Sequence, residues 1–376
     1  MRSICWFRND LRVQDNPALH NCCASSEEVI AIYFVNREQW KEHNDAQIKI
    51  NFWLRNLKEL QQKLDKLNIP LVVLEADNYE KTIKVLLEYC ETNSVKNLYF
   101  NVEYPINELK RDREIFVHFK EHGIGVFPSH DQVIHEPGSL KTKAGTNFSV
   151  YSPFKRKWFE ELEEHQLELL GVPEKKVNLN IQSTDLSNYL QEYSHDKCAL
   201  WPAGEEFIQN YIDEFLKLKG TTYKVKRNFP AIDATAKLSP YINAGVVSSK
   251  WCLVKAREYN NGLLDDGNKG IVHWVSEILW REFYRHIIYN FPKVSKNLPF
   301  IDYTKNIPWN DNAEYLERWM KGQTGIPIVD AGIREMLETG WMHNRLRMIV
   351  AMFLSKNLLI DWQKGEKFFM EHLVDG

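Results

Sequence analysis

With 376 residues, 44% of them hydrophobic and 26% charged, the chain is long enough to bury more than one hydrophobic core. It has no run of about 18 apolar residues, and Arg2 and Asp10 lie where a signal peptide needs its apolar core, which excludes the membrane and secreted classes and predicts a cytoplasmic protein. The formal net charge of −3 is uneven: residues 1–220 carry 27 Lys and Arg against 34 Asp and Glu, and residues 221–376 carry 21 against 17, so a polyanion is expected to meet the second part.

Residues 1–133 alternate short apolar runs with amphipathic stretches. The runs cover residues 4–7, 29–35, 69–76, 97–104 and 124–128, and between two of them Ile48–Asn68 has leucines at helical spacing. Near-continuous apolar runs separated by helices are typical of a parallel sheet covered on both faces. We therefore predict a doubly wound α/β domain over residues 1–133. It contains neither GxGxxG nor a P-loop, so no ordinary phosphate-binding motif is present.

Residues 134–203 are predicted to connect two domains, because glycines and prolines punctuate them and a polar tract follows. Residues 204–376 lack strand signals and are predicted to form an all-α domain. Gly340, directly after one helical pattern, fits a helix C-terminus. The predicted helices cover Glu205–Lys219, Ser248–Tyr259, Ile271–Tyr289, Ala313–Lys321, Pro327–Glu338 and His343–Asn357.

The cysteines and tryptophans limit the chemistry that can be expected. The six cysteines form no CxxC pair and have no histidine at zinc-site spacing, so we expect reduced thiols and predict neither disulfides nor a metal. Seven of the 12 tryptophans fall in residues 251–376. An aromatic-rich core and a surface that stacks a planar ligand both explain this, and composition leaves the two open.

Two clusters in the helical region could carry chemistry. In the first, Glu277, Trp280, Arg281 and Tyr284 are three and four residues apart and share one helix face. This face is either a surface ion pair above a packed tryptophan, or a site at which Glu277 hydrogen-bonds a base and Trp280 stacks on it.

The second cluster is Gly340–Met348, where a helix opens with one His, one Asn and two Arg within five residues. Asn344, Arg347 and Met348 share one face. An amide and an arginine beside a methionine suit a planar heterocycle with phosphates nearby, although a solvated helix start has the same composition.

Five segments then carry a resemblance to a known family: Trp6–Leu19 (WFRNDLRVQDNPAL), Arg227–Gly245, Glu277–His286, Thr324–Met348 and Leu358–Gly376. Together they closely resemble class I cyclobutane pyrimidine dimer photolyases of the photolyase/cryptochrome family. The resemblance implies a carbon–carbon lyase whose helical domain holds FAD. In this family the reduced, anionic flavin, excited by light, donates an electron to a pyrimidine dimer flipped out of DNA and so repairs it.

By this resemblance, eleven residues contact FAD. Tyr223 and the 235–239 loop match the phosphate side, and Arg347 with Asp375 matches the pair beside the flavin ring. Many relatives have Ser and Arg where this chain has Ala236 and Lys237, which removes a hydroxyl here but keeps a cation. The full set is Tyr223, Thr235, Ala236, Lys237, Leu238, Ser239, Glu277, Arg281, Asn344, Arg347 and Asp375.

The resemblance also assigns catalytic and DNA-binding residues. Glu277 and Asn344 are expected near the dimer, and Trp309 and Trp362 match members of the family's photoreduction chain of tryptophans. The expected contacts to dimer-containing DNA are Glu277, Trp280, Arg281, Asn344, Arg345, Arg227 and Lys155.

A second, light-harvesting cofactor is implied for the α/β domain. His43, Asn107, Glu108 and Lys296 match positions that bind a reduced folate in folate-type relatives, so a methenyltetrahydrofolate antenna is expected. Deazaflavin and FMN types share the same α/β domain. We expect the protein to work as a monomer on DNA.

Two other functions are compatible with parts of this sequence. A cryptochrome-type photoreceptor would share the fold and FAD without repair, but Trp280, Asn344 and Met348 match the cyclobutane class. A nucleotide-binding α/β protein with a helical cap is the other alternative.

The sequence stops at Gly376, inside a motif that relatives continue, so we expect an incomplete helical domain that retains FAD poorly and repairs weakly.

Overall fold

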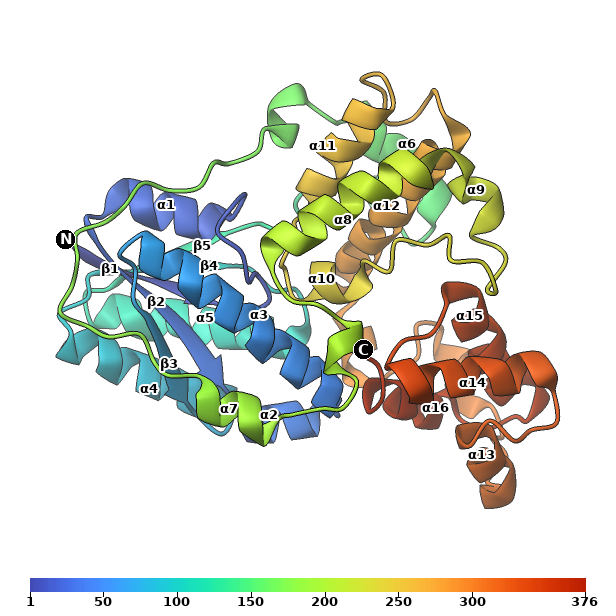
Figure 1. The fold of residues 1–376 in the computed structure, drawn as a ribbon. Coiled ribbons are helices and arrows are strands. Elements are labelled where there is room, and N and C mark those ends of the chain that lie inside the picture. Colours follow the sequence, from blue (N-terminus) through green and yellow to red (C-terminus); the bar gives the residue numbers. More distant parts are fainter.

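A parallel five-stranded sheet forms the first part of the computed structural model, which describes residues 1–376 (Figure 1). Its strands are β1 (Arg2–Phe7), β2 (Glu28–Val35), β3 (Leu71–Glu75), β4 (Asn97–Asn101) and β5 (Gly125–Ser129). They lie in the order β3-β2-β1-β4-β5, and every neighbouring pair is parallel. Each predicted apolar run overlaps one strand, so the doubly wound α/β fold is confirmed.

Helices cover both faces of the sheet, because side chains along each strand alternate between the faces. Ile4 and Trp6 of β1 belong to an apolar cluster with residues of α4 (Tyr79–Thr92) and α5 (Ile106–Glu121), whereas Cys5 and Phe7 pack with residues of α1 (Pro17–Ser25) and α3 (Gln47–Lys66). The helices of this part are α1 (Pro17–Ser25), α2 (Arg37–Glu42), α3 (Gln47–Lys66), α4 (Tyr79–Thr92) and α5 (Ile106–Glu121).

The segment between the sheet and the later helices covers a free edge of the sheet. The backbone N of Thr184 donates to the carbonyl of Leu71 at 2.8 Å, and its hydroxyl accepts from the backbone N of Val73 at 3.0 Å. These bonds occupy groups of edge strand β3 that would otherwise be open to another strand. The segment also contains two helices that the sequence pattern did not predict, α6 (Tyr151–Glu160) and α7 (Ser187–Glu192).

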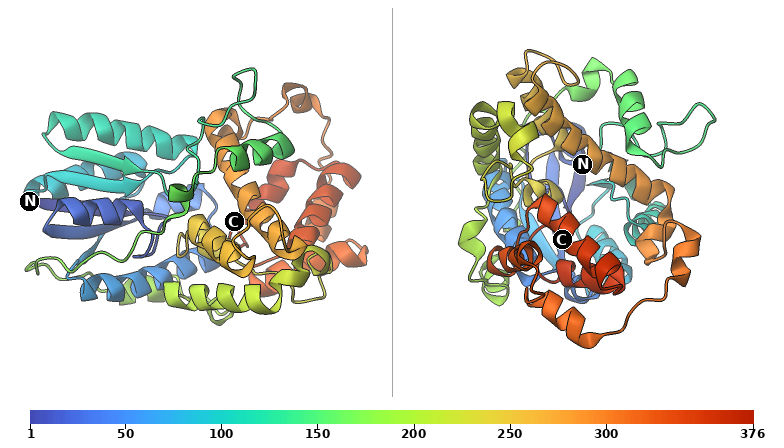
Figure 2. Two further views of the ribbon diagram at one scale, coloured as in Figure 1. Left: turned by 90° about the horizontal axis from the view of Figure 1, so that it is seen from above. Right: turned by 90° about the vertical axis from the view of Figure 1, so that its right-hand side faces the viewer.

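The second part is helical, and Figure 2 shows it beside the sheet. All six predicted helices are present, although the last is α-helical only to Met352 and continues in wider turns over Phe353–Asn357. None of the helices in the chain combines the length and apolarity that crossing a membrane requires. The helices are α8 (Glu205–Leu218), α9 (Tyr223–Lys226), α10 (Ser239–Asn243), α11 (Ser249–Tyr259), α12 (Lys269–Asn290), α13 (Ala313–Met320), α14 (Pro327–Thr339), α15 (Asn344–Met352) and α16 (Trp362–Met370).

The two parts meet where the segment after β1 lies against the turn between α10 and α11. The backbone N of Leu11 donates to the carbonyl of Ala244 at 3.1 Å, and the buried Arg12 guanidinium bonds both Asp131 and the carbonyl of Gly245. Gly245 has φ +65°, and a Cβ there would lie 2.1 Å from the carbonyl oxygen of Asn9. Only glycine permits this close approach, which fixes the helical part against the strand ends.

The cysteines lie inside this framework. All six are free thiols, and all but Cys198 are buried. Burial raises the pKa of Cys90 and Cys252 to about 12, which keeps these thiols protonated and unreactive at neutral pH.

Candidate functional site

A cavity of about 360 Å³ lies between α10, α12, α15 and the loop before α10. It contains residues from the two clusters singled out in the sequence and from the 235–239 loop. All eleven residues that the resemblance predicts to contact FAD line this one cavity: Tyr223, Thr235, Ala236, Lys237, Leu238, Ser239, Glu277, Arg281, Asn344, Arg347 and Asp375.

One wall of the cavity is α12. Asn268 caps its first turn, since the side-chain oxygen accepts from the backbone N of Gly270 at 2.8 Å. Further along, Glu277, Arg281 and Arg285 follow at four-residue intervals and therefore lie on one face of the helix. The helix thus presents one carboxylate and two guanidiniums to the same space.

Glu277 is the acidic group of this wall, and it is paired inside the cavity. Nη1 of Arg227 donates to its carboxylate, and Nε2 of His273 lies 3.7 Å from the same oxygen. The Arg227 side chain is only 6% exposed. The Arg227 guanidinium is thus buried on Glu277, and its contact with a DNA phosphate stays a prediction.

Arg347 and Asp375 form a second pair, as the resemblance implied. Nη2 of Arg347 donates to both Asp375 oxygens at 2.8 and 2.9 Å, and its Nε donates to the carbonyl of Met342 at 2.8 Å. The Asp375 side chain is 1% exposed, so its charge depends on this guanidinium. The pair therefore joins α15 to the last residues of the chain.

His343 offers the cavity an unused polar atom. Its Nδ1 accepts from the backbone N of Arg345 at 3.1 Å and caps α15, while its buried Nε2 has no partner. Burial and the cations around the ring lower the pKa of His343, so the ring is neutral and carries its proton on Nε2. An unsatisfied buried donor costs about 1–3 kcal/mol, which an acceptor in the cavity would offset.

The loop before α10 contributes an unusual backbone. Lys237 has φ +46°, a left-handed conformation that non-glycine residues rarely adopt. Its Nζ lies 5.6 Å from the centre of the Trp341 ring and 3.5 Å from the carboxylate of Asp233. Lys237 keeps a cation at the place where many relatives have arginine.

Several wall residues were not predicted from the sequence. Trp274 and Arg285 lie on the same face of α12 as Glu277, so the helical period could have identified them. Asn243 had no such signal, because an amide in a short helix is an ordinary feature. Arg227 was expected as a DNA contact, and Trp341, Met342 and His343 belong to the Gly340–Met348 cluster. The wall residues that no sequence prediction named are Ile242, Asn243, Trp274, Ile278 and Arg285.

Trp280 lies outside this cavity and is stacked on Tyr151. The ring centroids are 3.6 Å apart at an interplanar angle of 12°, and the Tyr151 hydroxyl donates to the carbonyl of Ser276 at 2.8 Å. Nζ of Lys155 donates to the Ser276 hydroxyl at 3.2 Å. Trp280 of α12 thus packs against α6, the helix that also carries Lys155, and one face of the tryptophan is covered by Tyr151.

The two remaining predicted DNA contacts differ in position. Arg345 is half-buried, and its Nε and Nη2 donate to the side-chain oxygen of Asn228 at 3.0 and 2.9 Å. Arg281 faces inward, where Nη1 donates to the carbonyl of Gln132 at 2.8 Å. The Arg281 guanidinium thus bonds a backbone carbonyl of the protein, and its contact with a DNA phosphate stays a prediction.

Trp309 and Trp362 do not line the cavity. Trp362 begins α16 with 40% of its side chain exposed, and Trp309 is half-buried in the loop before α13. The backbone N of Asn310 donates to the carbonyl of Leu359 at 2.6 Å, which joins the two tryptophan-bearing loops.

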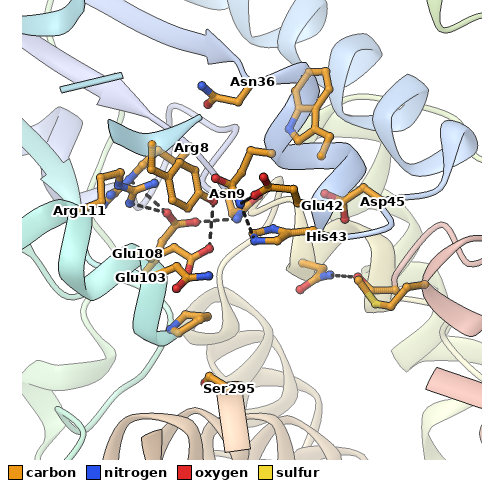
Figure 3. Close-up of a pocket in the computed structure, with 18 of the residues that line it drawn as sticks. Arg8, Asn9, Asn36, Glu42, His43, Asp45, Glu103, Glu108, Arg111 and Ser295 are labelled. Atoms are coloured by element: carbon orange, nitrogen blue, oxygen red, sulfur yellow. Dashed lines mark hydrogen bonds and ion pairs between the residues drawn. The ribbon is translucent and has the colours of Figure 1, made fainter. Parts of the chain in front are cut away.

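A second cavity, of about 720 Å³, opens at the carboxyl ends of the parallel strands, where α/β sheets commonly bind ligands (Figure 3). Figure 3 shows His43 and Glu108 directed into the same space, with Ser295 approaching from the helical part. Asn107 also lines it. Lys296 does not: its side chain is exposed, and Ser295 and Asn297 on either side of it line the cavity instead.

The inner end of this second cavity holds a buried charge network that the sequence did not reveal. Arg111 donates to Glu103 at 2.9 Å, and Arg8 donates to Asp112 at 2.7 Å. Nε of Arg8, 3.6 Å from the Glu103 carboxylate, and the indole nitrogen of Trp6 are buried without a hydrogen-bond partner. Two donors on the wall are therefore available to a polar ligand.

The predicted antenna residues have partners of their own. Nε2 of His43 lies 2.9 Å from the amide nitrogen of Gln39, and the Tyr79 hydroxyl donates to Glu108 at 2.9 Å. Asn243 and Arg285 line this cavity as well as the first, so they form the wall between the two.

Comparisons with known proteins agree with this arrangement. Residues 3–174 match the family described as DNA photolyase, and residues 274–376 match the FAD binding domain of DNA photolyase. A deoxyribodipyrimidine photo-lyase from Buchnera aphidicola subspecies Acyrthosiphon pisum is 36% identical over 380 residues, which cover 100% of this chain and 78% of that protein.

Solved structures have the same fold. A bacterial class III photolyase from Agrobacterium tumefaciens superposes with a TM-score of 0.88 at 30% identity, over 100% of this chain and 76% of that one. An archaeal photolyase from Sulfolobus tokodaii, solved with two FAD molecules, superposes with a TM-score of 0.84 at 25% identity, over 100% and 80%.

Proposed function

The chain belongs to the DNA photolyase family, and from this we propose that it is a deoxyribodipyrimidine photo-lyase that repairs cyclobutane pyrimidine dimers in light, with FAD as its cofactor. The observation that carries the proposal is the single cavity lined by all eleven residues expected to contact FAD. These residues come from several separate segments between residues 223 and 375, so their meeting is not a consequence of local sequence.

The wall of the cavity suits FAD. The buried Nε2 of His343 needs an acceptor, and the pyrophosphate and the ring carbonyls of FAD supply acceptors. The loop from Thr235 to Ser239 and the Tyr223 side chain would hold the phosphates, while the pair of Arg347 and Asp375 would lie beside the ring.

When bound and reduced, FAD supplies the electron that, after light is absorbed, splits the cyclobutane ring. The chain's residues bind and orient the dimer. We assign Glu277 and Asn344 to hydrogen bonds with the flipped bases, because both line the cavity. Trp280 would stack on the dimer with the ring face that Tyr151 leaves open, since aromatic stacking accepts any base.

Arg345 and Lys155 are the cations that we assign to the DNA backbone. Both are half-buried, and neither forms an ion pair with a carboxylate, so their charges are available to phosphates. Trp309 and Trp362, outside the cavity, are assigned to the path that passes electrons toward the flavin. The protein would act as a monomer, since one chain supplies every residue of the cavity, and it would act where chromosomal DNA is.

For the second cavity we assign a light-harvesting cofactor, with a reduced folate as the specific candidate. His43, Asn107 and Glu108 line it and offer the polar edges that a pterin ring can hydrogen-bond. The Sulfolobus tokodaii photolyase contains a second FAD, so a second flavin is the competing occupant. Chemical extraction and mass spectrometry of the purified protein would distinguish the two.

The function is tested by purifying the protein, identifying its flavin, and following thymine dimers in an oligonucleotide in light and in darkness. Loss of dimers only in light is expected, and no loss in a protein that holds FAD would contradict repair. A signalling photoreceptor without repair would give that negative result. It is not favoured, because the relative at 36% identity is a deoxyribodipyrimidine photo-lyase.

A further inference from the structure

Exposed apolar side chains and cations alternate on and directly after the short helix α9. Val225 is 63% exposed and Phe229 is 53% exposed, although both are large apolar residues. Lys224 and Lys226 stand on either side of Val225 and are exposed as well. We call this region, together with the arginine that it contacts on α15, the α9 surface; it consists of Lys224, Val225, Lys226, Phe229 and Arg345.

The cations of the α9 surface are not neutralised by the protein. Residues 215–232 contain five Lys and Arg and no Asp or Glu. Two of the five have acidic partners, Lys219 on Asp233 at 2.7 Å and Arg227 on Glu277. Lys224, Lys226 and Arg345 form no ion pair with a carboxylate, so all three charges are available to an anionic partner.

The α9 surface is held in place by Asn228. Its side-chain oxygen accepts from Nε and Nη2 of Arg345 at 3.0 and 2.9 Å, and its amide nitrogen donates to the carbonyl of Lys224 at 3.3 Å. The backbone N of Phe229 donates to the carbonyl of Lys226 at 3.1 Å, which closes the turn after α9. The exposed ring therefore sits on a bonded turn, and a ligand that stacks on it loses little affinity to ordering the protein.

The α9 surface lies beside the first cavity and outside it. Tyr223 and Arg227, from the same segment, line the cavity, whereas Phe229 and the two lysines do not. Figure 1 shows the loop after α9 reaching toward α15, the helix that begins with Asn344. Phe229 is thus placed to contact DNA next to the dimer, and not the dimer inside the cavity.

The chemistry of the α9 surface suits DNA. Cations that contact phosphates, next to an aromatic ring on which a base can stack, are the usual combination in nucleic-acid binding. A dimer that flips out of the duplex leaves the bases next to it without a stacking partner. An exposed phenylalanine beside three unpaired cations offers such a base a new partner.

We propose that the α9 surface is a DNA-contact site in which Phe229 stacks on a base beside the flipped dimer, while Lys224 and Lys226 contact the flanking phosphates. The inference rests on the proposed function, because it requires DNA from which a dimer is flipped.

The variants Phe229→Ala, Lys224→Gln and Lys226→Gln separate the two kinds of contact in the whole protein. Fluorescence anisotropy gives the affinity for a duplex with one thymine dimer and for the same duplex undamaged, at several salt concentrations. Flavin absorbance checks that the first cavity is intact. The matched controls are Phe116→Ala and Lys120→Gln on α5, since Phe116 is 49% exposed and Lys120 is exposed without an ion pair.

In Phe229→Ala we expect the affinity for the dimer duplex to fall about ten-fold, because a stacked base is lost. The affinity for the undamaged duplex should stay unchanged, since only flipping exposes a base to the ring. The dependence of the logarithm of the affinity on the logarithm of the salt concentration should also stay unchanged. Phe229→Tyr should bind like wild type, because it keeps the ring.

Lys224→Gln and Lys226→Gln should each weaken binding to both duplexes. Each should also reduce the slope of the salt dependence by about 0.9, the value for one phosphate contact on B-form DNA.

Wild-type affinity of Phe229→Ala for the dimer duplex, or an equal loss for both duplexes, would overturn the inference. So would an unchanged salt slope in the lysine variants, or the same losses in the α5 controls; the α9 surface would then meet another partner, such as a protein with an acidic face. A wild-type chain that neither binds nor repairs dimers would overturn the proposed function as well. A wild-type chain that repairs dimers, with variants that bind as it does, overturns this inference alone.

Discussion

A single nitrogen of Arg347, Nη2, bonds both carboxylate oxygens of Asp375, and it is the only cation paired with this almost fully buried side chain. Removing one partner of a buried pair leaves an uncompensated charge, which typically costs about 3–5 kcal/mol. We expect Arg347→Met to lower the free energy of unfolding by about 3 kcal/mol, toward the lower end because Arg347 is 24% exposed. Urea unfolding measures this loss.

The double variant Arg347→Met with Asp375→Asn is the control for this effect. It removes the orphaned charge, so it should regain a large part of the lost free energy of unfolding. Losses that simply add would mean that the pair contributes little.

Glu277→Gln should reduce light-driven dimer splitting about ten-fold while FAD remains bound. The carboxylate is assigned to the dimer, and a hydrogen bond to a charged group contributes about 1.5–3 kcal/mol. The glutamine keeps the shape and can still accept from Arg227, so the wall should stay folded. Repair rates at saturating damaged DNA and flavin absorbance are measured together. Loss of flavin in this variant would show that Glu277 serves the cofactor instead.

Trp280→Ala should weaken binding to dimer-containing DNA by about 1–3 kcal/mol, the usual cost of removing an aromatic residue on which a base stacks. Fluorescence anisotropy with a damaged and an undamaged duplex measures it. Tyr151→Phe is the matched control, since it keeps the ring stacked on Trp280 and removes only the hydroxyl. Equal affinities of Trp280→Ala and wild type for the damaged duplex would contradict the assignment.

The sequence predicted the parts of the fold that depend on periodicity. Five apolar runs gave five strands, and the pattern of Ile48–Asn68 gave α3 to within two residues at each end. The helix α6 was missed because Pro153 was interpreted as connector punctuation, whereas proline is favourable in a first helical turn. The helices α9 and α10 have four and five residues, too few for a periodic pattern.

The site was predictable as far as helical spacing and family motifs extend. Spacing placed Glu277 and Arg281 on one face, and the resemblance supplied Asp375. Neither could show that Arg227, 50 residues before Glu277, turns inward to pair with it. Long-range pairing depends on how α9 packs against α12, which no local pattern encodes.

The second cavity gives a prediction that separates positions adjacent in sequence. His43→Ala and Glu108→Ala should each reduce the amount of antenna cofactor that copurifies, without abolishing repair, because the first cavity is unchanged. Lys296→Ala should have no such effect, since Lys296 does not line the cavity. Absorbance of extracted chromophores per mole of protein gives the amounts. Depletion by Lys296→Ala equal to that by His43→Ala would contradict the assignment.

Glu282 and His286 are two buried titratable groups on α12. We expect their contributions to the free energy of unfolding to depend on pH in opposite directions. The Glu282 carboxylate accepts from the backbone N of Ile134 and of His135 at 3.0 Å, yet burial raises its pKa to about 7. His286, whose Nε2 lies 2.9 Å from the carbonyl of His135, has its pKa lowered by burial to about 4. Both shifts are changes from ordinary values of 4.5 and 6.5.

Between pH 4.5 and 7 the folded protein holds the Glu282 proton that the unfolded chain has released, so this group's contribution to the free energy of unfolding falls as the pH rises. Between pH 6.5 and 4 the unfolded chain protonates His286 before the folded protein does, so that contribution is present above pH 6.5 and is lost as the pH falls. Each shift corresponds to about 3 kcal/mol. The free energy of unfolding, measured in urea at pH 5 and pH 7, should therefore rise for Glu282→Gln relative to wild type as the pH rises. For His286→Gln it should fall relative to wild type over the same pH range. Differences from wild type that are the same at both pH values would mean that neither group changes protonation on folding.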